Sequence, residues 1–366
     1  MQKKIGMEKV LTAVFVVLLA AFVGAAFGEG YQPLVSAELL RHGKLESVWE
    51  TKLPMKKGES LEQLYILGNR IYGLSDRNYM VSLNREKGSV IFSRAVAPAG
   101  LPVVGLGLYE GELFSIIGND LVQMNPEFGT ELSSRRLAFG IASPAVRNSG
   151  HFYIAGTDRR IRALRSEDKV KVFESGAQND SRITSVIADE NFIVFGTDGG
   201  NVVSVESGRP VQQWQFDAAD SIAGSVVRDG DSLFVASKDT NIYKLDVHSG
   251  RLVWKYQAGV VLDTSPVVTG GVVYQRLREK GMAAIDKESG RFMWELEGGA
   301  GLLAESGKKA YVITHIGELV VMDNKKAKRL YSVNFSGVSL YVVNLADSKM
   351  YIADGSGRIA CIKPTE

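Results

Sequence analysis

Short apolar runs rich in β-branched and aromatic residues fill most of the chain, and small turn residues separate the runs. Residues 232–256 contain three such runs, "SLFVAS", "NIYKLD" and "VWKY", with Lys238-Asp239 and Ser249-Gly250 between them. Short runs of β-branched and aromatic residues, bounded by Asp, Gly and Ser, predict strands joined by tight turns. The repeated units show no helical spacing of apolar residues. We therefore expect an all-β fold.

The runs recur with a period near forty residues. Each unit is expected to form four strands, and the second strand of each unit begins 38 to 42 residues after that of the preceding unit. These second strands begin at Ile71, Leu113, Phe152, Phe192, Leu233, Val273, Tyr311 and Tyr351. Antiparallel four-stranded units with this period are typical of the blades of a β-propeller. The eight units predict an eight-bladed ring.

The last unit, "MYIADGSGRIACIKPTE", ends after its third strand. A matching fourth strand, "LESVWETKL", occupies residues 45–53, ahead of the first complete unit. We expect this N-terminal strand to complete the last blade, because closure removes an open sheet edge that would otherwise pair with other chains. The alternative, seven blades with a loose N-terminal strand, would leave that edge unpaired.

One eleven-residue segment occurs twice, as "KLDVHSGRLVW" (244–254) and "AIDKESGRFMW" (284–294), and both copies place Asp, Gly and Trp four residues apart. We expect the Asp to end the third strand and accept hydrogen bonds from turn amides, and the Gly to supply a positive φ. The Trp is expected on the outermost strand, where its ring covers the turn and contacts the next blade. We call this set the blade staple. Its members are Asp246, Gly250, Trp254, Asp286, Gly290 and Trp294, with Gly208 and Trp214 in a shortened copy and Trp49 in the N-terminal strand.

The other units carry weaker copies of the staple. Phe92, Phe173 and Tyr331 stand where these copies have Trp. The second unit, "QMNPEFGTELSSRRL", has Ser133 at that position. We expect ordinary sheet packing to hold the blades in which the staple is incomplete.

The composition is that of an ordinary folded protein, with 45 % hydrophobic and 23 % charged residues among 366. The formal charge is +2, and Lys3, Lys4 and Lys9 against Glu8 account for it. The rest of the chain is neutral, which argues against a nucleic-acid partner or an anionic membrane held by bulk charge. We expect protein partners and a monomeric ring.

The N-terminal segment predicts export. Lysines precede an apolar run over residues 10–27, with small residues at Ala26 and Gly28, as in a secretory signal cleaved after Gly28. The run has 18 residues, close to the roughly 20 that span a bilayer, so a retained anchor is the alternative. Either outcome places the propeller in the periplasm or cell envelope. The expected divisions are 1–28 as signal peptide or membrane anchor, 29–44 as linker and 45–366 as a single β-propeller domain.

The repeats resemble a known family. The segments "GTDGGNVVSVESGRPVQQW" (196–214) and "SKDTNIYKLDVHSGRLVW" (237–254), together with "AIDKESGRFMW", are similar to the PQQ-type propeller repeat, whose blades share an Ala/x-Asp-x-x-Thr-Gly-x-x-x-Trp ending. The signatures of WD-repeat and kelch propellers are missing. Among exported propellers the chain is most similar to the BamB family, whose members usually carry a lipidated Cys after the signal, where this chain has Glu29.

The resemblance implies a non-enzymatic periplasmic scaffold that docks partner proteins, with an accessory role in the assembly of outer-membrane β-barrel proteins. Quinone-dependent dehydrogenases share the repeat but use a pair of adjacent cysteines, and this chain has the single Cys361. Its four histidines lie far apart in sequence, without metal-ligand spacing. We therefore expect no catalytic, cofactor-binding or metal-binding residues. The alternative is a secreted propeller that binds a small ligand, or acts as an enzyme, through its central channel.

One arginine-rich segment is a candidate docking edge. In "DRRIRALR" (158–165), Arg160, Arg162 and Arg165 alternate with apolar residues along one predicted strand region. Charged side chains can protect a sheet edge from pairing with other chains. Arginines are also favoured at protein interfaces, where they form bidentate hydrogen bonds. The sequence leaves both roles open.

Overall fold

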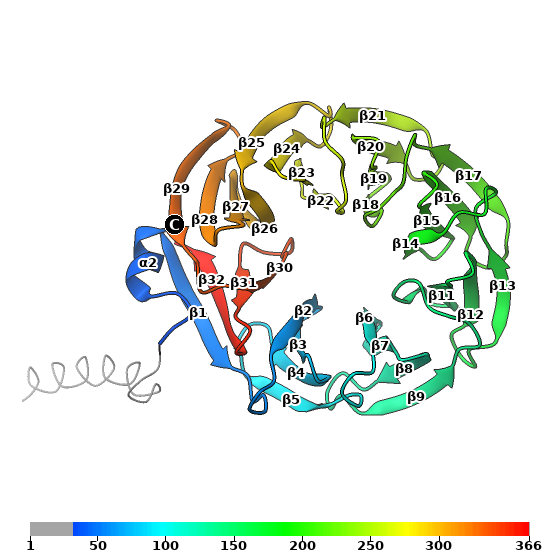
Figure 1. The fold of residues 1–366 in the computed structure, drawn as a ribbon, viewed down its shortest axis with the longest axis horizontal. Coiled ribbons are helices and arrows are strands. Elements are labelled where there is room, and N and C mark those ends of the chain that lie inside the picture. The colour runs from blue at the N-terminus through cyan, green and yellow to red at the C-terminus, as the bar shows by residue number, and fades with distance from the viewer. Residues whose placement is uncertain (1–31, 366) are drawn as a thin grey trace, which may run out of the picture.

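Eight four-stranded antiparallel sheets surround a common axis in the computed structural model, which describes residues 32–365 (Figure 1). The predicted eight-bladed β-propeller is confirmed. The expected signal or anchor, with its apolar run at 10–27, lies outside the described residues. Within 32–365, no helix is long and apolar enough to cross a membrane.

In seven of the blades the strands follow one another along the chain from the axis to the rim, and in the eighth the N-terminal strand takes the outermost place (Figure 1). The innermost strands are β2 (Leu61–Leu67), β6 (Val103–Tyr109), β10 (Val146–Arg147), β14 (Ile183–Ala188), β18 (Val227–Asp229), β22 (Val267–Val268), β26 (Gly299–Ser306) and β30 (Leu340–Val342). The second strands are β3 (Arg70–Ser75), β7 (Glu112–Ile117), β11 (His151–Ala155), β15 (Phe192–Thr197), β19 (Ser232–Ala236), β23 (Val272–Leu277), β27 (Lys309–Thr314) and β31 (Met350–Ala353).

The third strands are β4 (Tyr79–Asn84), β8 (Asp120–Met124), β12 (Ile161–Arg165), β16 (Asn201–Glu206), β20 (Asn241–Asp246), β24 (Gly281–Asp286), β28 (Glu318–Asp323) and β32 (Arg358–Pro364). The outermost strands are β5 (Val90–Ala95), β9 (Glu131–Arg136), β13 (Lys171–Ser175), β17 (Gln212–Asp217), β21 (Leu252–Gln257), β25 (Phe292–Glu297), β29 (Lys328–Asn334) and β1 (Leu45–Lys52). We number the blades 1 to 8 from β2–β5 onward, so that blade 8 consists of β30–β32 and β1.

The N-terminal strand closes the ring, as predicted. Strand β1 pairs antiparallel with β32, from Leu45 opposite Pro364 to Lys52 opposite Arg358. The Thr365 amide extends this pairing by donating to the Lys44 carbonyl at 2.8 Å. Blade 8 therefore has four strands like the others, and its sheet has no open position between β32 and the rim.

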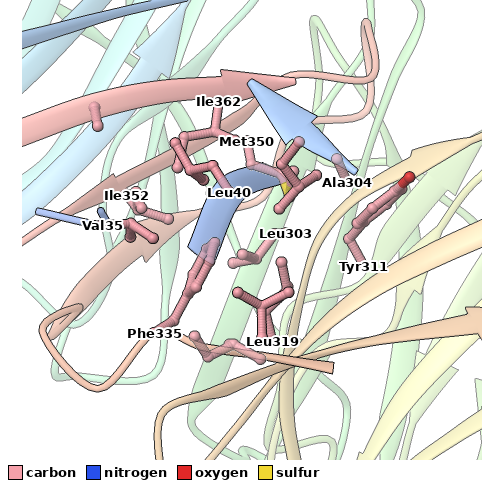
Figure 2. Close-up of a cluster of buried hydrophobic side chains, with 14 of the residues drawn as sticks. Val35, Leu40, Leu303, Ala304, Tyr311, Leu319, Phe335, Met350, Ile352 and Ile362 are labelled. Atoms are coloured by element: carbon pink, nitrogen blue, oxygen red, sulfur yellow. The ribbon is translucent and has the colours of Figure 1, made fainter. Parts of the chain in front are cut away.

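The described residues ahead of β1, 32–44, fall within the expected linker and pack against the ring. They contain the short helix α2 (Ala37–His42), which begins at the capping residue Ser36. Leu34, Val35 and Leu40 are buried against blades 7 and 8, in the cluster drawn in Figure 2. A helix of six residues is too short to produce a periodic apolar pattern, so it could not be predicted from periodicity.

The hydrophobic core is divided among the junctions between blades. Each of the eight junctions encloses one cluster of buried side chains, contributed mainly by the second and third strands on its two sides. Between blades 4 and 5, for example, Val194 and Val202 meet Leu233 and Leu245. Contact between neighbouring blades, rather than a single central core, therefore carries most of the apolar burial.

A β-bulge recurs at one place in every blade. The register between the third and outermost strands shifts beside the position where the staple has its Trp, as at Lys244/Leu245 opposite Trp254. The residues at this position are Phe92, Ser133, Phe173, Trp214, Trp254, Trp294, Tyr331 and Trp49. Bulges bend a strand and change the direction of its side chains. The repeated bulge gives these eight side chains equivalent places at the rim.

Candidate functional site

The staple joins two blades rather than closing one turn. Trp254 of blade 5 donates from Nε1 to the Lys287 carbonyl in the turn of blade 6, at 3.0 Å. Its ring lies over Gly290 of the same turn, where a Cβ atom would come within 2.7 Å of Cδ2. Gly290 has a φ of 70°. Only a glycine tolerates both this conformation and the closeness of the ring.

Three other tryptophans make equivalent contacts with the following blade. Trp214 donates to the Val247 carbonyl at 3.0 Å, and Trp49 donates to the Arg85 carbonyl at 3.1 Å. Trp294 donates to Asn324 Oδ1 at 2.9 Å. The rings that cover a glycine of the next turn are Trp49 over Gly88, Phe92 over Gly129, Trp214 over Gly250 and Trp254 over Gly290. A Trp and the Gly it covers therefore come from successive repeats.

The staple aspartates organise their own turns. Asp246 Oδ1 accepts from the Ser249 amide at 2.8 Å and from the Ser249 hydroxyl at 2.5 Å. Asp286 accepts the same two bonds from Ser289. The serine hydroxyl, followed by the serine amide, lowers the pKa of each carboxyl below its usual value. These carboxylates are bound by their own turns, which gives them a local structural role.

Gly208 does not share the geometry of Gly250 and Gly290. Its φ is not positive, and no atom lies within 4 Å of the place that its Cβ would occupy. The turn of blade 4 has the same length as the turn of blade 5, but Pro210 rather than Gly208 stands where blade 5 has Gly250. Trp214, which follows it, does cover the turn of blade 5.

The three candidate docking arginines do not lie on a sheet edge. Arg162 and Arg165 belong to β12, which pairs with strands on both sides. The Arg162 side chain is only 12 % exposed, and it forms ion pairs with Asp158 and Glu174. Arg160 and Arg165 are 44 % and 50 % exposed and also have carboxylate neighbours, Asp180 and Asp168 respectively. These two therefore present charge to solvent, while Arg162 forms part of a groove wall.

That groove lies between β9 of blade 2 and the β12–β13 hairpin of blade 3, and we call it the blade 2–3 groove. It consists of two adjoining hollows of about 410 and 390 Å³ that share Lys169. Ser133 lines the first hollow at the position that is aromatic in the other blades. The cationic side chains of the second hollow are Arg135, Arg136, Arg162, Lys169 and Lys171. The sequence marked Ser133 as unusual but did not show which residues would face it.

A separate hollow of about 500 Å³ lies between blades 6 and 7. The β23–β24 turn, the connection from β25 to β26 and His315 line it, so it is on the face opposite the staple turns. Its charged groups have both signs, with Arg276, Arg278 and Lys280 beside Glu279 and Glu297. Across residues 32–365, no three His, Cys, Asp or Glu side chains are placed to hold a metal ion.

Comparison with known proteins agrees with this architecture. Residues 200–365 match a family model described as outer membrane protein assembly factor BamB. The predicted resemblance to PQQ-type propellers and to BamB is thereby confirmed. No curated protein sequence matches the chain.

Two solved structures show the same fold at low sequence identity. BamB from Moraxella catarrhalis superposes with a TM-score of 0.69 at 15 % identity, covering 87 % of this chain and 97 % of that one. The computationally designed Ika8 protein superposes with a TM-score of 0.66 at 13 % identity, covering 85 % of this chain and 98 % of the design. At these identities the likeness shows the fold alone, because one fold can serve many functions.

Proposed function

We propose that this protein is a non-enzymatic scaffold of the cell envelope that docks partner proteins and has a BamB-like accessory role in outer-membrane β-barrel assembly. The observation that carries the proposal is the match of residues 200–365 to the BamB family model. The closed ring supports it, since most of the described chain forms blades and the connections between them. The apolar run at 10–27 agrees with export to the periplasm.

The proposal assigns roles to the staple residues and to the arginines of residues 158–165. The staple residues are structural, since they join successive blades at the rim. Arg160 and Arg165 are the members of the arginine segment with side chains free enough to contact a partner. Their ion pairs are exposed and therefore weak, so a partner carboxylate can replace Asp180 or Asp168.

Affinity purification of the full-length protein from its native envelope tests the proposal. Recovery of a β-barrel assembly subunit, identified by mass spectrometry, is the expected result. An Arg160→Glu/Arg165→Glu variant should recover less of it, while Lys255→Glu, an exposed charge reversal on β21, should recover the wild-type amount. A pull-down without assembly subunits, from cells that contain them, would overturn the assembly role.

A further inference from the structure

The junction between blades 2 and 3 is open at the rim. All six residues of β9 are exposed, whereas Trp214 at the equivalent place on β17 is only 8 % exposed. Ser133 turns back to its own blade, where its hydroxyl donates to Gln123 Oε1 at 2.9 Å. A serine is too short to cover the turn of blade 3. The blade 2–3 groove therefore occupies the place that a ring fills in the stapled junctions.

Positive charge is in excess in the second hollow of the groove, which no carboxylate of residues 32–365 lines. The five cations there face three neighbouring carboxylates, because Asp120 pairs with Arg136, Asp158 with Arg162, and Glu174 with both Arg162 and Lys171. Arg135 has no hydrogen-bond or carboxylate partner among the described residues. Burial, followed by the charge of Arg147, lowers the pKa of Lys169. An unpaired arginine and a partly buried lysine in a positive field favour an anionic ligand.

Apolar surface accompanies this charge. Leu132 is 58 % exposed and Val170 is 45 % exposed, one on each side of the groove. Phe139 lies beneath the Arg162 guanidinium, 4.2 Å from the ring centroid to Cζ. Exposed apolar side chains beside arginines are typical of protein-binding surfaces. The first hollow carries two carboxylates, Glu112 and Glu167, and Arg147 pairs with Glu112 at 2.6 Å.

We infer that the blade 2–3 groove binds an extended segment of a partner protein that carries a large aromatic side chain flanked by carboxylates. The partner's ring takes the rim position that Ser133 leaves open, and its carboxylates contact Arg135 and Lys169. The inference rests on the proposed scaffold role and adds the chemistry of the docked segment.

Lys169 fixes how the ring can enter. It adopts a φ of 59° at the turn position where the stapled blades have glycine. Its Cβ occupies the space into which the rings of Trp49, Trp214 and Trp254 project in the stapled junctions. An incoming ring must therefore lie farther from the turn, against Leu132 and Val170, where the Lys169 ammonium can also contact its face.

Fluorescence anisotropy with the full-length protein and a labelled synthetic peptide, a central Trp flanked by aspartates, tests the inference. We expect saturable binding that weakens about tenfold for Arg135→Glu, because that change reverses one contacting charge. Replacing the peptide Trp by Ala, or its aspartates by lysines, should abolish binding. The matched variant Lys255→Glu, on a blade whose junction Trp254 fills, should bind normally.

A second variant fills the groove from within. Ser133→Trp combined with Lys169→Gly restores both halves of the staple and should block the peptide while raising the urea midpoint. If circular dichroism shows that this double variant does not fold, the peptide binding of Arg135→Glu alone decides the test. The inference would be overturned if the wild-type protein does not bind the peptide, or if Arg135→Glu binds it as tightly as the wild-type protein does. Peptide binding without recovered assembly subunits would leave the groove assignment standing and remove only the assembly role.

Discussion

Gly250→Ala tests whether contact between a ring and a glycine holds the blades together. The residue has a φ of 67°, and an added Cβ would come within 2.7 Å of Trp214 Cδ2. Left-handed backbone costs an L-residue about 1–2 kcal/mol, and forcing an atom into a packed site adds about 1–3 kcal/mol. We therefore expect the free energy of unfolding to fall by about 2–5 kcal/mol.

Gly230→Ala is the matched control. Gly230 has a φ of 57°, but no atom lies within 4 Å of its Cβ position, so it should lose only the conformational term of about 1–2 kcal/mol. Urea unfolding followed by far-UV circular dichroism measures both variants. The difference between them isolates the contact with Trp214.

A double-mutant cycle makes the test sharper. In a Trp214→Ala background the ring is gone, so Gly250→Ala should cost no more than Gly230→Ala. The coupling between the two positions should be about 1–3 kcal/mol, within the range for residues in contact. Equal losses for the two glycine variants in wild-type protein, or a coupling near zero, would refute the reasoning that the ring makes this glycine necessary.

Three further predictions concern other parts of the ring. Cys361 is buried, which raises its pKa to about 11, so its thiol should react with a disulfide reagent at pH 8 only after unfolding; rapid labelling of native protein would contradict this. The pKa of Asp246 is lower in the folded state than its usual 3.8, so its contribution to stability is complete above that value and is lost as the pH falls through the folded pKa; Asp246→Asn should flatten the acid side of the stability profile, and an unchanged slope would refute this. Deleting residues 45–52 removes β1 from β32 and should produce concentration-dependent association by light scattering, because an open edge pairs with other chains; a stable monomer would count against closure as the reason for this strand.

The repeat made the blades predictable and indicated that each Trp contacts the next blade, but it did not show which turn the ring covers. A forty-residue period with turn signals indicated eight sheets, and the missing fourth strand of the last unit indicated closure. The spacing of Asp246, Gly250 and Trp254 suggested that each Trp covers the turn of its own repeat while it contacts the next blade. In the structure a β-bulge lies beside Trp254, and the Trp254 ring covers Gly290 of the next repeat. Gly250 is covered instead by Trp214 of the preceding repeat. A sequence period does not show which of two equivalent neighbours a side chain will contact.

The groove was less predictable for a similar reason. Ser133 was visible as an exception, but its meaning depends on β12 and β13 of the following blade, which form the opposite wall. The alternation in "DRRIRALR" favoured an exposed edge. The pairing of β12 on both sides instead makes Arg162 part of a wall between two blades.

The pairing of β1 with β32 sets the order of events during synthesis. Strand β1 is synthesised first, but its partner β32 lies about 300 residues later in the chain. The two strands can therefore pair only after almost the whole chain has been synthesised. Until then, β1 has no partner strand and the sheet of blade 8 is incomplete. A prematurely terminated product can never complete blade 8 and keeps β1 available to chaperones and proteases. Blade 8 can therefore be completed only by a chain that includes both β1 and β32.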